Sequence, residues 1–319
     1  MSPSLTGISL HVKALLTTGH GPTDLRLADI DEPSPREDEA VVEVRAVSVN
    51  RGELAHAERL PPGSRLGWDV AGVVVRAADD GSGPAAGTRV VGVAPSTGWA
   101  ERVAVPTRAL ASLPEEVRDT EAAALPVAGL TAYHSLRKAG WLLGSTLLVT
   151  GAGGGVGRFL VQLAARGGAR VIAVVGSAER AVGLGELGAS VVTTYDDVPD
   201  ELPDLVVDGV GGQILAAAMD RLKPDGVAVA YGNASGQPLT LPADWGHRHP
   251  DTVFRRFSLL LEASRTPMAP TLAFLIQLLA SGLLDPQVAA TAPWGEAKPL
   301  LEDLLHRRVN GKVVLTVGS

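Results

Sequence analysis

A glycine-rich turn between an apolar strand and a helix is the feature that most constrains the fold of this chain. Residues 146–150 (TLLVT) have the composition of a buried strand, and residues 156–166 have helical spacing of apolar side chains. The turn contains Ala152, Gly153, Gly154, Gly155, Val156 and Gly157. Its A-x-G-x-x-G spacing fits the dinucleotide-binding pattern, with alanine in the first position. In this strand–turn–helix context the pattern predicts a nucleotide-binding unit, whereas the same glycines elsewhere would form only a flexible loop.

Small residues in such a turn have a steric and an electrostatic purpose. They permit a tight turn and let the backbone approach a pyrophosphate, while the start of the helix presents free N–H groups and a positive dipole end. Gly157 is expected to let the helix pack closely on the strand. We therefore predict that this turn binds the pyrophosphate of a dinucleotide.

Strands and helices alternate along the chain after residue 145. The expected strands are residues 146–150, 170–175, 191–194, 205–208 and 226–231, and the expected helices are residues 156–166, 179–187, 271–281 and 296–307. This alternation predicts a doubly wound parallel sheet with helices on both faces, which is the Rossmann class of α/β fold.

The first 120 or so residues have a different character, with short strands and few helical windows. Strands are expected at residues 41–49, 69–75 and 89–93. A helix is expected at residues 121–138, with a break or kink at Pro126, and a last strand at residues 312–317. The sequence therefore predicts a second, irregular β-rich domain.

The end of the second Rossmann strand bears on the choice of nicotinamide cofactor. An NAD enzyme usually has Asp or Glu about 20 residues past the glycines, where the acid binds the ribose 2′-hydroxyl. In this chain Ser177 lies 20 residues after Gly157, and Arg180 follows where a guanidinium could bind a 2′-phosphate. Glu179 is the nearest acid, but it lies at an expected helix start, where the dipole favours Glu. The pattern favours NADPH over NADH, although Arg180 also fits a solvated surface residue.

Composition argues against several other classes of protein. The net charge of −7 argues against a nucleic-acid-binding protein, which normally has a basic face. The chain has no cysteine, which excludes disulfides, thiolate catalysis and thiolate zinc sites. No apolar run is long enough to span a membrane, and the N-terminal residues show no secretory signal. We therefore expect a cytoplasmic protein with a small-molecule substrate and no nucleic-acid or membrane partner.

Seven short segments form a recognisable series along the chain. They are residues 13–27 (KALLTTGHGPTDLRL), 47–50 (VSVN), 67–74 (GWDVAGVV), 98–101 (GWAE), 125–133 (LPVAGLTAY), the glycine turn, and 310–315 (NGKVVL). In this order they resemble the zinc-free quinone oxidoreductase branch of the medium-chain dehydrogenase/reductase superfamily. Any one segment is weak, but the series is specific for the family, although not for a substrate.

The resemblance implies a domain organisation that periodicity does not show. It implies a discontinuous GroES-like catalytic domain, residues 1–123 and 285–319, around a Rossmann NADPH-binding domain, residues 124–284. It also implies an active site in the cleft between the domains and a homodimer formed through the nucleotide domain.

The resemblance also indicates that no metal is bound. Zinc-using members have histidine where this chain has Trp68, together with cysteine ligands that are absent here. His247 and His249 are two residues apart and could suggest a metal site, but in a loop that contains Pro and Trp they are more often surface residues.

Three residues are the candidates for catalysis by this resemblance. Asn50 and Thr131 are expected near the nicotinamide, where a short polar side chain can orient a carboxamide or an acceptor carbonyl, although turn and helix-capping roles fit them equally. Asp69 matches an acid that organises the site, through Arg51, through His56 or by pairing with a backbone group.

The source of a proton is left open by the sequence. Glu53 and His56 lie in the segment that usually faces the substrate, and either could donate a proton or belong to a solvated helix face. Many relatives have a Tyr in this loop, but residues 53–67 contain none.

Further residues are implied to contact the cofactor. Tyr231 and Asn233 lie in a loop expected near the nicotinamide half, and Tyr195 matches a position near the adenine ribose phosphate. Asn310 and Lys312 are also expected to approach the cofactor, although a Gly-Lys before a terminal strand could be an ordinary turn.

The leading hypothesis for function is hydride transfer from NADPH to a conjugated acceptor, either a quinone or an enone or enoyl C=C bond. The absence of zinc favours this reaction over alcohol oxidation, in which a Lewis acid normally stabilises the alkoxide. Two alternatives are an NADPH-binding protein with a scaffold or other non-redox role, and a carbonyl reductase acting on a natural-product intermediate.

Overall fold

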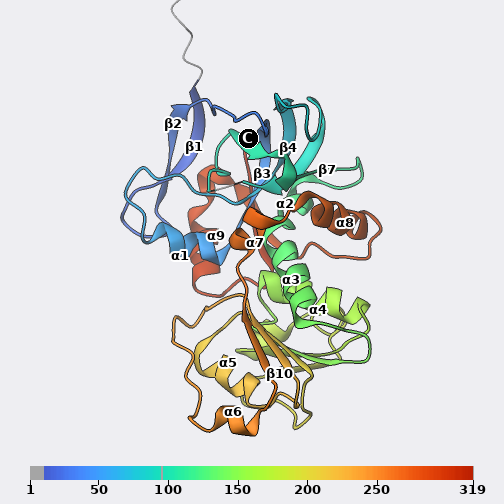
Figure 1. The fold of residues 1–319 in the computed structure, drawn as a ribbon. Coiled ribbons are helices and arrows are strands. Elements are labelled where there is room, and N and C mark those ends of the chain that lie inside the picture. The colour runs from blue at the N-terminus through green and yellow to red at the C-terminus, as the bar shows by residue number, and fades with distance from the viewer. Residues whose placement is uncertain (1–10, 95, 319) are drawn as a thin grey trace, which may run out of the picture. The chain divides into compact units, whose positions relative to one another are not determined.

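The computed structural model describes residues 11–94 and 96–318 of the chain (Figure 1). The chain forms two compact units. One contains Met1–Pro126, Ala290–His306 and Val313–Ser319, and the other contains Val127–Ala289 and Arg307–Lys312. The first ten residues, on which the expectation of no secretory signal rests, lie outside the described residues. No helix in the described part of the chain is long and apolar enough to cross a membrane.

The first unit is built on a β-sheet with short helices at its margins. Its strands are β3 (Glu39–Val49), β4 (Asp69–Arg76), β5 (Arg89–Val93), β6 (Arg102–Pro106), β7 (Leu110–Ser112), β14 (Val288–Pro293) and β15 (Lys312–Thr316), in the order β14-β15-β3-β4-β5-β7 with β6 also paired to β3. A separate hairpin contains β1 (His11–Thr17) and β2 (Leu25–Asp31). The helical segments are α1 (Arg51–Ala57), η1 (Thr107–Ala109), α2 (Asp119–Ala123), η3 (Trp294–Glu296) and α9 (Lys298–Leu305).

Strand β3 is the centre of this sheet, which explains its apolar sequence. Most of its residues are buried, and along its edges it pairs with β4, β6 and β15. Its pairing with β4 is irregular between Val44 and Ala46. A Cβ at Gly72 would lie only 2.0 Å from the Glu43 carbonyl oxygen, so glycine is required where β4 passes this irregularity.

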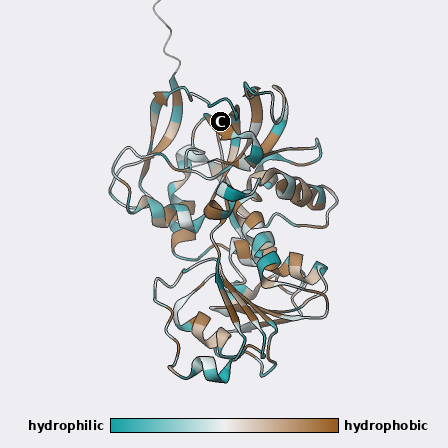
Figure 2. Cartoon of the chain, in the orientation of Figure 1, coloured by the Kyte–Doolittle hydropathy of each residue, from teal (hydrophilic) through white to brown (hydrophobic). Residues whose placement is uncertain are grey.

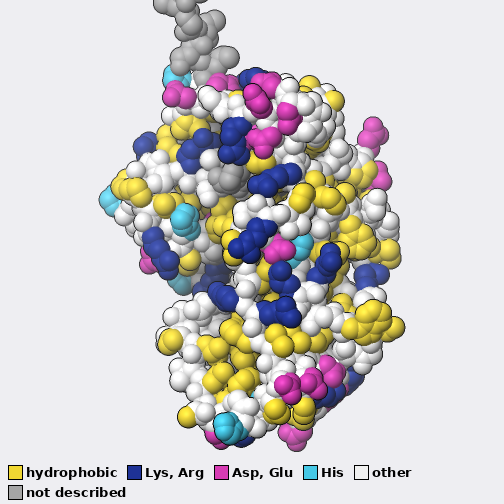
Figure 3. Space-filling view, in the orientation of Figure 1, with side chains coloured by type: hydrophobic (Ala, Val, Ile, Leu, Met, Phe, Trp, Pro, Cys, Tyr) yellow, Lys and Arg dark blue, Asp and Glu magenta, His cyan; other side chains and the backbone are white. Residues whose placement is uncertain are grey.

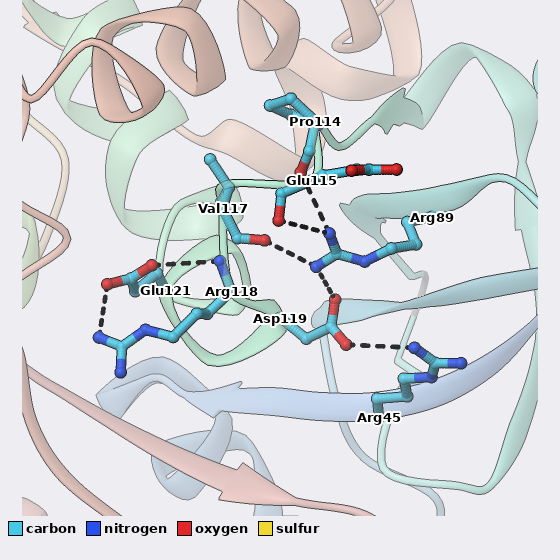
Figure 4. A network of polar contacts seen from close by, with 8 residues as sticks. All are labelled: Arg45, Arg89, Pro114, Glu115, Val117, Arg118, Asp119 and Glu121. Atoms are coloured by element: carbon cyan, nitrogen blue, oxygen red, sulfur yellow. Dashed lines mark hydrogen bonds and ion pairs between the residues drawn. The ribbon is translucent and has the colours of Figure 1, made fainter.

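Arg89, the first residue of β5, ties the segment before α2 to the sheet (Figure 4). Its guanidinium donates to the carbonyl oxygens of Pro114 at 3.1 Å and Val117 at 2.7 Å, and to Asp119 Oδ1 at 2.6 Å. The second oxygen of Asp119 lies 3.7 Å from Arg45. Since Asp119 is the first residue of α2, this network fixes where the helix begins.

The second unit is a parallel sheet flanked by helices. Its strands are β8 (Thr146–Thr150), β9 (Arg170–Val175), β10 (Val191–Thr194), β11 (Leu205–Asp208), β12 (Val227–Ala230) and β13 (Val253–Arg256). Its helical segments are α3 (Pro126–Ala139), α4 (Gly155–Arg166), η2 (Ala178–Ala181), α5 (Gly212–Met219), α6 (Trp245–Arg248), α7 (Leu259–Arg265) and α8 (Ala269–Ala280). The central strands are hydrophobic along their length (Figure 2), as expected for strands covered on both faces.

The strand order places the glycine turn where ligands bind in this kind of sheet. The order is β10-β9-β8-β11-β12-β13, and every recorded pair in it is parallel. The chain moves outward on one side of β8 through β9 and β10, then returns to β11 on the other side. This reversal creates a crevice at the carboxyl end of β8, where the turn lies. The predicted Rossmann sheet is confirmed, and four of its five expected strands match β8, β9, β10 and β11 residue for residue.

The expected helix at residues 179–187 is wrong. Only the short 3-10 segment Ala178–Ala181 forms, and turns follow it. Arg158 Nη2 donates to the Val182 carbonyl oxygen at 2.9 Å, and Gly183 has a φ of +80°. The Val182 carbonyl oxygen therefore accepts a hydrogen bond from a side chain of α4.

The remaining differences between the predicted and the observed elements are the start of a helix and three elements that the sequence pattern did not indicate. The expected helix 121–138 is two helices, α2 and α3, because α3 begins at Pro126, whose fixed φ suits a first helical position. Elements α5, α7 and β13 were not expected. Each has no more than eight residues, too few for periodicity to distinguish them from loops.

Candidate functional site

The glycine turn has the geometry that its sequence predicts. Gly151 follows β8 with a φ of +65°, and Gly154 caps α4 in an extended conformation. A Cβ at Gly157 would lie 2.4 Å from the Gly151 carbonyl oxygen and 2.6 Å from Ala152 Cα, so the helix packs against the turn with no room for a side chain. A Cβ at Gly154 would meet only the Gly151 oxygen, at 3.4 Å. The backbone at Gly154 is therefore open to close approach by a pyrophosphate.

Two cationic residues flank this turn. A Cβ at Gly153 would lie 2.6 Å from the Arg180 carbonyl oxygen, and a Cβ at Gly155 would lie 2.8 Å from Lys312 Cδ. Lys312 is buried, and Gly154 forms a parallel bridge with Gly311 next to it. Residues far apart in sequence thus bring positive charge to the turn, which suits a pyrophosphate.

Arg180 is half-buried, so its interpretation as a solvated surface residue is wrong. Its Nη1 donates to the carbonyl oxygens of Arg307, at 2.8 Å, and Val309. Burial lowers the pKa of Arg180, and the positive charges of Arg158 and Arg307 add to this effect. Positive charge is therefore concentrated around Arg180 beside the turn.

The end of β9 is connected to the segment before β15. Asn310 Nδ2 donates to the Glu179 carbonyl oxygen at 2.7 Å, so Asn310 anchors this connection. Ser177 is extended, and a hydrogen bond from its side chain lowers the pKa of the exposed Glu179 carboxyl. Glu179 is thus in reach of Ser177, although it belongs to the 3-10 segment and not to the strand.

A buried carboxyl group lies at the carboxyl edge of the sheet beside the turn. Asp208, the last residue of β11, is fully buried; its Oδ2 accepts from the Thr150 hydroxyl and its Oδ1 from the Gly211 N–H at 2.8 Å. Burial raises the pKa of Asp208, and these hydrogen bonds oppose the rise. Sequence reasoning missed this residue, although an Asp ending an apolar strand before glycines was a readable signal.

The predicted cofactor residues Tyr195, Tyr231 and Asn233 lie around this carboxyl group. Burial raises the pKa of both tyrosines, and the charge of Asp208 contributes to each rise. A Cβ at Gly209 would lie 2.4 Å from the Tyr231 hydroxyl oxygen, and one at Gly211 would lie 2.2 Å from Asn233 Oδ1. Because Gly209 and Gly211 have no side chains, the loop after β12 can pack directly against the backbone that follows β11.

Asn50 is the centre of a buried polar cluster in the first unit. It is the N-cap residue of α1, so the helix-capping position considered for it is confirmed. Its Nδ2 donates to Asp69 Oδ2 at 2.8 Å and to Glu53 Oε2 at 3.2 Å. Asn50 is thus a partner of Asp69 that the sequence did not suggest.

Glu53 is fully buried, so its interpretation as part of a solvated helix face is wrong. Its carboxylate accepts from the backbone N–H of Asn50 and of Trp68, each at 2.6 Å. Helical spacing could not show this, because both partners come from outside the helix. His56 on the same helix is exposed.

Thr131 and Trp68 are placed by different elements. Thr131 lies in α3 and is buried. Trp68 precedes β4; its Nε1 donates to Ser96 Oγ at 3.2 Å, and its ring lies 3.0 Å from the position of a Cβ on Gly52. An indole thus fills the position at which zinc-using relatives have histidine.

Within residues 11–94 and 96–318, no group of three or more acidic, His or Cys side chains is arranged to hold a metal. The His247–His249 pair was considered as a metal site. His249 instead stacks on Trp245, with ring centroids 4.9 Å apart, and its Nε2 lies 3.1 Å from Asp220 Oδ1.

The fold and the glycine turn define a nucleotide-dependent oxidoreductase with a GroES-like unit and a Rossmann unit. Family models agree with this class. Residues 36–115 match the alcohol dehydrogenase GroES-like domain, and residues 155–259 match the zinc-binding dehydrogenase family.

Curated relatives extend over most of the chain. Erythronolide synthase EryA2 of Saccharopolyspora erythraea is 32% identical over 90% of this chain, which spans only 8% of that protein's length. The synaptic vesicle membrane protein VAT-1 homolog of Rattus norvegicus is 30% identical over 96% of this chain and 84% of its own. Acryloyl-coenzyme A reductase of Metallosphaera sedula is 26% identical over 96% of this chain and 100% of its own.

Solved structures show the same fold. The quinone oxidoreductase from Coxiella burnetii has a TM-score of 0.83 and 26% identity, covering 97% of this chain and 100% of its own. Mycobacterial Rv1454c complexed with NADPH has a TM-score of 0.85 and 27% identity, covering 96% and 99%. The chain belongs to the zinc-free quinone oxidoreductase branch of the medium-chain dehydrogenase/reductase superfamily, and it is an oxidoreductase of this NAD(P)-binding family.

Proposed function

We propose that this chain is a zinc-independent reductase that uses NADPH to reduce a conjugated acceptor, either a quinone or an enone or enoyl C=C bond. The observation that carries the proposal is the open glycine turn with Arg180 and Lys312 against it. The names of two relatives, a quinone oxidoreductase and an acryloyl-coenzyme A reductase, describe acceptors of this kind.

The preference for NADPH rests on the residues at the end of β9. The strand ends without a carboxylate, and Ser177 occupies the position where an NAD enzyme has an acid. Arg180 and Tyr195 supply a guanidinium and a phenol beside the turn, groups that suit a 2′-phosphate. The structural relative Rv1454c is complexed with NADPH, which supports the same choice.

When bound, NADPH supplies the hydride to the β-carbon of the acceptor. The residues of this chain must hold the acceptor and stabilise the negative charge that develops on its oxygen, until a proton is added at the α-carbon. We assign the stabilisation of this charge to the hydroxyl of Thr131, and we assign the positioning of the cofactor carboxamide to the amide oxygen of Asn50, whose nitrogen is held by Asp69 and Glu53. Hydrogen bonds replace a Lewis acid in this assignment because the chain has no cysteine and has Trp68 in the position of the zinc-binding histidine.

The proposal is tested by following NADPH oxidation at 340 nm with 9,10-phenanthrenequinone and a panel of enones, with NADH in parallel. We expect turnover with NADPH and much less with NADH. Product analysis separates a saturated ketone, which the proposal requires, from an allylic alcohol, which would indicate carbonyl reduction. If no acceptor causes NADPH oxidation, the proposal is wrong.

The oligomeric state is part of the same proposal. Members of this family are commonly dimeric, and we propose a homodimer. Light scattering of the purified chain at several concentrations tests this directly, and a single monomeric species throughout would overturn it.

A further inference from the structure

An apolar pocket lies within the second unit, where the carboxyl ends of α3 and α4 meet α8. It has a volume of about 310 Å³. Figure 3 shows hydrophobic side chains, with Lys and Arg side chains among them, over α3 and α8. We call it the α3–α4–α8 pocket. Its apolar side chains come from four segments of the chain and are those of Tyr133, Leu136, Leu142, Leu163, Phe274 and Leu278.

Two glycines at the helix ends help to form this pocket, and both line it. Gly140 follows α3, and nothing lies within 4 Å of the position of a Cβ on it. Gly167 follows α4, and a Cβ there would lie 2.7 Å from Leu142 Cδ1. Because Gly167 has no side chain, Leu142 can pack against the end of α4 and form part of the pocket wall.

The charge of this pocket is entirely positive. Among the described residues that line it, the charged ones are Arg137 in the last turn of α3 and Arg166 at the end of α4. Both are exposed, and no carboxylate in the described part of the chain lies within ion-pair distance of either. A cation in a last helical turn also suits the helix dipole, so its position alone does not indicate a ligand. Two such cations beside an apolar pocket, however, are complementary to an anion that has an apolar body.

The two arginines favour a carboxylate as the anionic group. A guanidinium can donate two parallel hydrogen bonds to the oxygens of a carboxylate or a phosphate. Both α3 and α4 end at the pocket, however, and the negative ends of their dipoles disfavour a doubly charged phosphate more than a singly charged carboxylate. The pocket therefore suits a monocarboxylate.

The volume and the lining indicate the size and kind of the apolar body. A water molecule occupies about 30 Å³ in the liquid, so the pocket has space for about ten non-hydrogen atoms, the number in an eight-carbon carboxylate. The ring of Tyr133 already has Phe274 at a centroid distance of 5.8 Å and the guanidinium of Arg137 at 6.0 Å. The other apolar side chains are leucines. This lining favours a flexible aliphatic chain over an aromatic ring, which needs a partner ring for stacking.

We propose that the α3–α4–α8 pocket binds a medium-chain fatty acid, with its carboxylate at Arg137 and Arg166 and its aliphatic chain against the leucines. The site is separate from the glycine turn, because the turn precedes α4 and the pocket lies at the other end of this helix. The twelve residues of α4 rise by about 18 Å. A fatty acid in the pocket therefore leaves the proposed cofactor site free.

Calorimetry with the NADPH-loaded protein tests binding while the cofactor site is filled. Octanoate is compared with octan-1-ol, which has no charge, and with butyrate, which lacks four methylene groups. We expect octanoate to bind at least about ten-fold more tightly than octan-1-ol, because a charge-assisted contact is lost in the alcohol. We also expect at least about a ten-fold advantage over butyrate, because each buried methylene contributes to affinity. No binding of octanoate, or equal binding of octanoate and either other compound, would overturn the proposal.

A pair of charge variants tests the position of the carboxylate. Arg137→Gln/Arg166→Gln should weaken octanoate binding about ten-fold and leave the affinity for NADPH unchanged. Arg255→Gln/Arg265→Gln is the matched control, because both residues are exposed, belong to the same unit and lie outside this pocket. The control should bind octanoate as the wild type does. An equal loss in both variants would mean that net charge alone acts, and binding that neither variant weakens would place octanoate elsewhere; either result would refute the proposal.

A second pair of variants tests the apolar wall. Phe274 is 43% exposed, so Phe274→Ala should fold, and the loss of its ring from the wall should weaken octanoate binding about five-fold. Leu260→Ala on α7 is the control, because Leu260 is 47% exposed and lies outside the pocket. Thermal unfolding confirms that both variants are folded. Wild-type affinity for octanoate in folded Phe274→Ala would exclude the pocket as the binding site.

Discussion

Asn50 Nδ2 donates to Asp69 Oδ2 at 2.8 Å across nineteen residues of sequence, and the same nitrogen donates to Glu53 Oε2 at 3.2 Å. An amide nitrogen has two hydrogens, so both face a carboxylate here. The orientation of the amide is thereby fixed, and its oxygen must point away from the two acids. This arrangement explains how a short side chain at a helix start can present a defined acceptor atom.

The first prediction concerns the stability that Asn50 confers. Asn50→Ala removes the donor shared by two buried carboxylates, and we expect the free energy of unfolding to fall by about 2 to 3 kcal/mol. His56→Ala on the same helix is the control, because His56 is exposed and its replacement should change stability by less than about 0.5 kcal/mol. Urea unfolding measures both variants. Equal stabilities of the two would contradict the role assigned to Asn50.

The second prediction concerns the 2′-phosphate. Ser177→Asp combined with Arg180→Ala should raise KM for NADPH by about ten-fold or more and should favour NADH, since a guanidinium is lost and an acid is placed at the strand end. Steady-state kinetics with both cofactors measures the change. Arg170→Ala is the control, because Arg170 starts the same strand at its opposite end and is half-exposed. An unchanged cofactor preference in the double variant would refute the assignment of Arg180.

The third prediction separates binding from folding within the glycine turn. Gly154→Val should fold, since a Cβ there meets only one atom, at 3.4 Å, but should abolish NADPH binding by filling the space for the pyrophosphate. Gly157→Ala should instead destabilise the protein by about 1 to 3 kcal/mol, since its Cβ would lie 2.4 Å from a carbonyl oxygen. Fluorescence titration with NADPH and thermal unfolding measure the two effects. A folded Gly154→Val variant that still binds NADPH tightly would rule out this site.

The parallel sheet could be predicted from sequence because the residues that specify each strand are adjacent in the chain. Strands β8 and β9 are short apolar runs bounded by polar or glycine residues, and they match the expected ranges residue for residue. Their burial on both faces requires an apolar run, and such a run is readable without tertiary information.

The polar clusters could not be predicted because their partners are distant in sequence. Glu53 is polar and lies on a helix, which suggests exposure, yet Trp68 N–H makes it a buried acceptor. In the same way, Arg158 from α4 donates to the Val182 carbonyl oxygen, within the segment of residues 179–187 that was expected to be a helix. A buried charged side chain can be recognised only when the groups that hydrogen-bond to it are known. In these examples those groups come from another element.

The fourth prediction concerns the network around Arg89. Arg89→Ala leaves the carbonyl oxygens of Pro114 and Val117, together with Asp119, without their donor, and we expect a loss of about 2 kcal/mol in stability. Affinity for NADPH, measured on the folded variant, should not change, because the network lies in the unit without the glycine turn. The partly exposed Arg102, paired with Glu32, is the control when replaced by Ala. A stability loss no larger than that of Arg102→Ala would show that the Arg89 network does not hold α2.

The last prediction concerns the pH dependence of stability. His134 on α3 is buried, and its ring stacks on Phe257 with centroids 6.3 Å apart. Burial lowers the pKa of His134; the charges of Arg137 and Lys138 on α3 act in the same direction, and Glu262 on α7 opposes them. The buried Nε2 has no hydrogen-bond partner in the described part of the chain.

The lowered pKa of His134 determines how its contribution to stability changes with pH. The unfolded chain takes up a proton on this residue near pH 6.5, while the folded protein does so only at lower pH. The stability contribution is therefore complete above about pH 6.5 and is lost as the pH falls through the folded pKa. His134→Phe keeps the ring contacts and removes the titration. We expect the free energy of unfolding to fall less between pH 7.5 and pH 5.5 in this variant than in the wild type, as measured by urea unfolding. The exposed His247, replaced by Gln, should show the wild-type fall, and an identical fall in His134→Phe would mean that burial of His134 does not shift its titration.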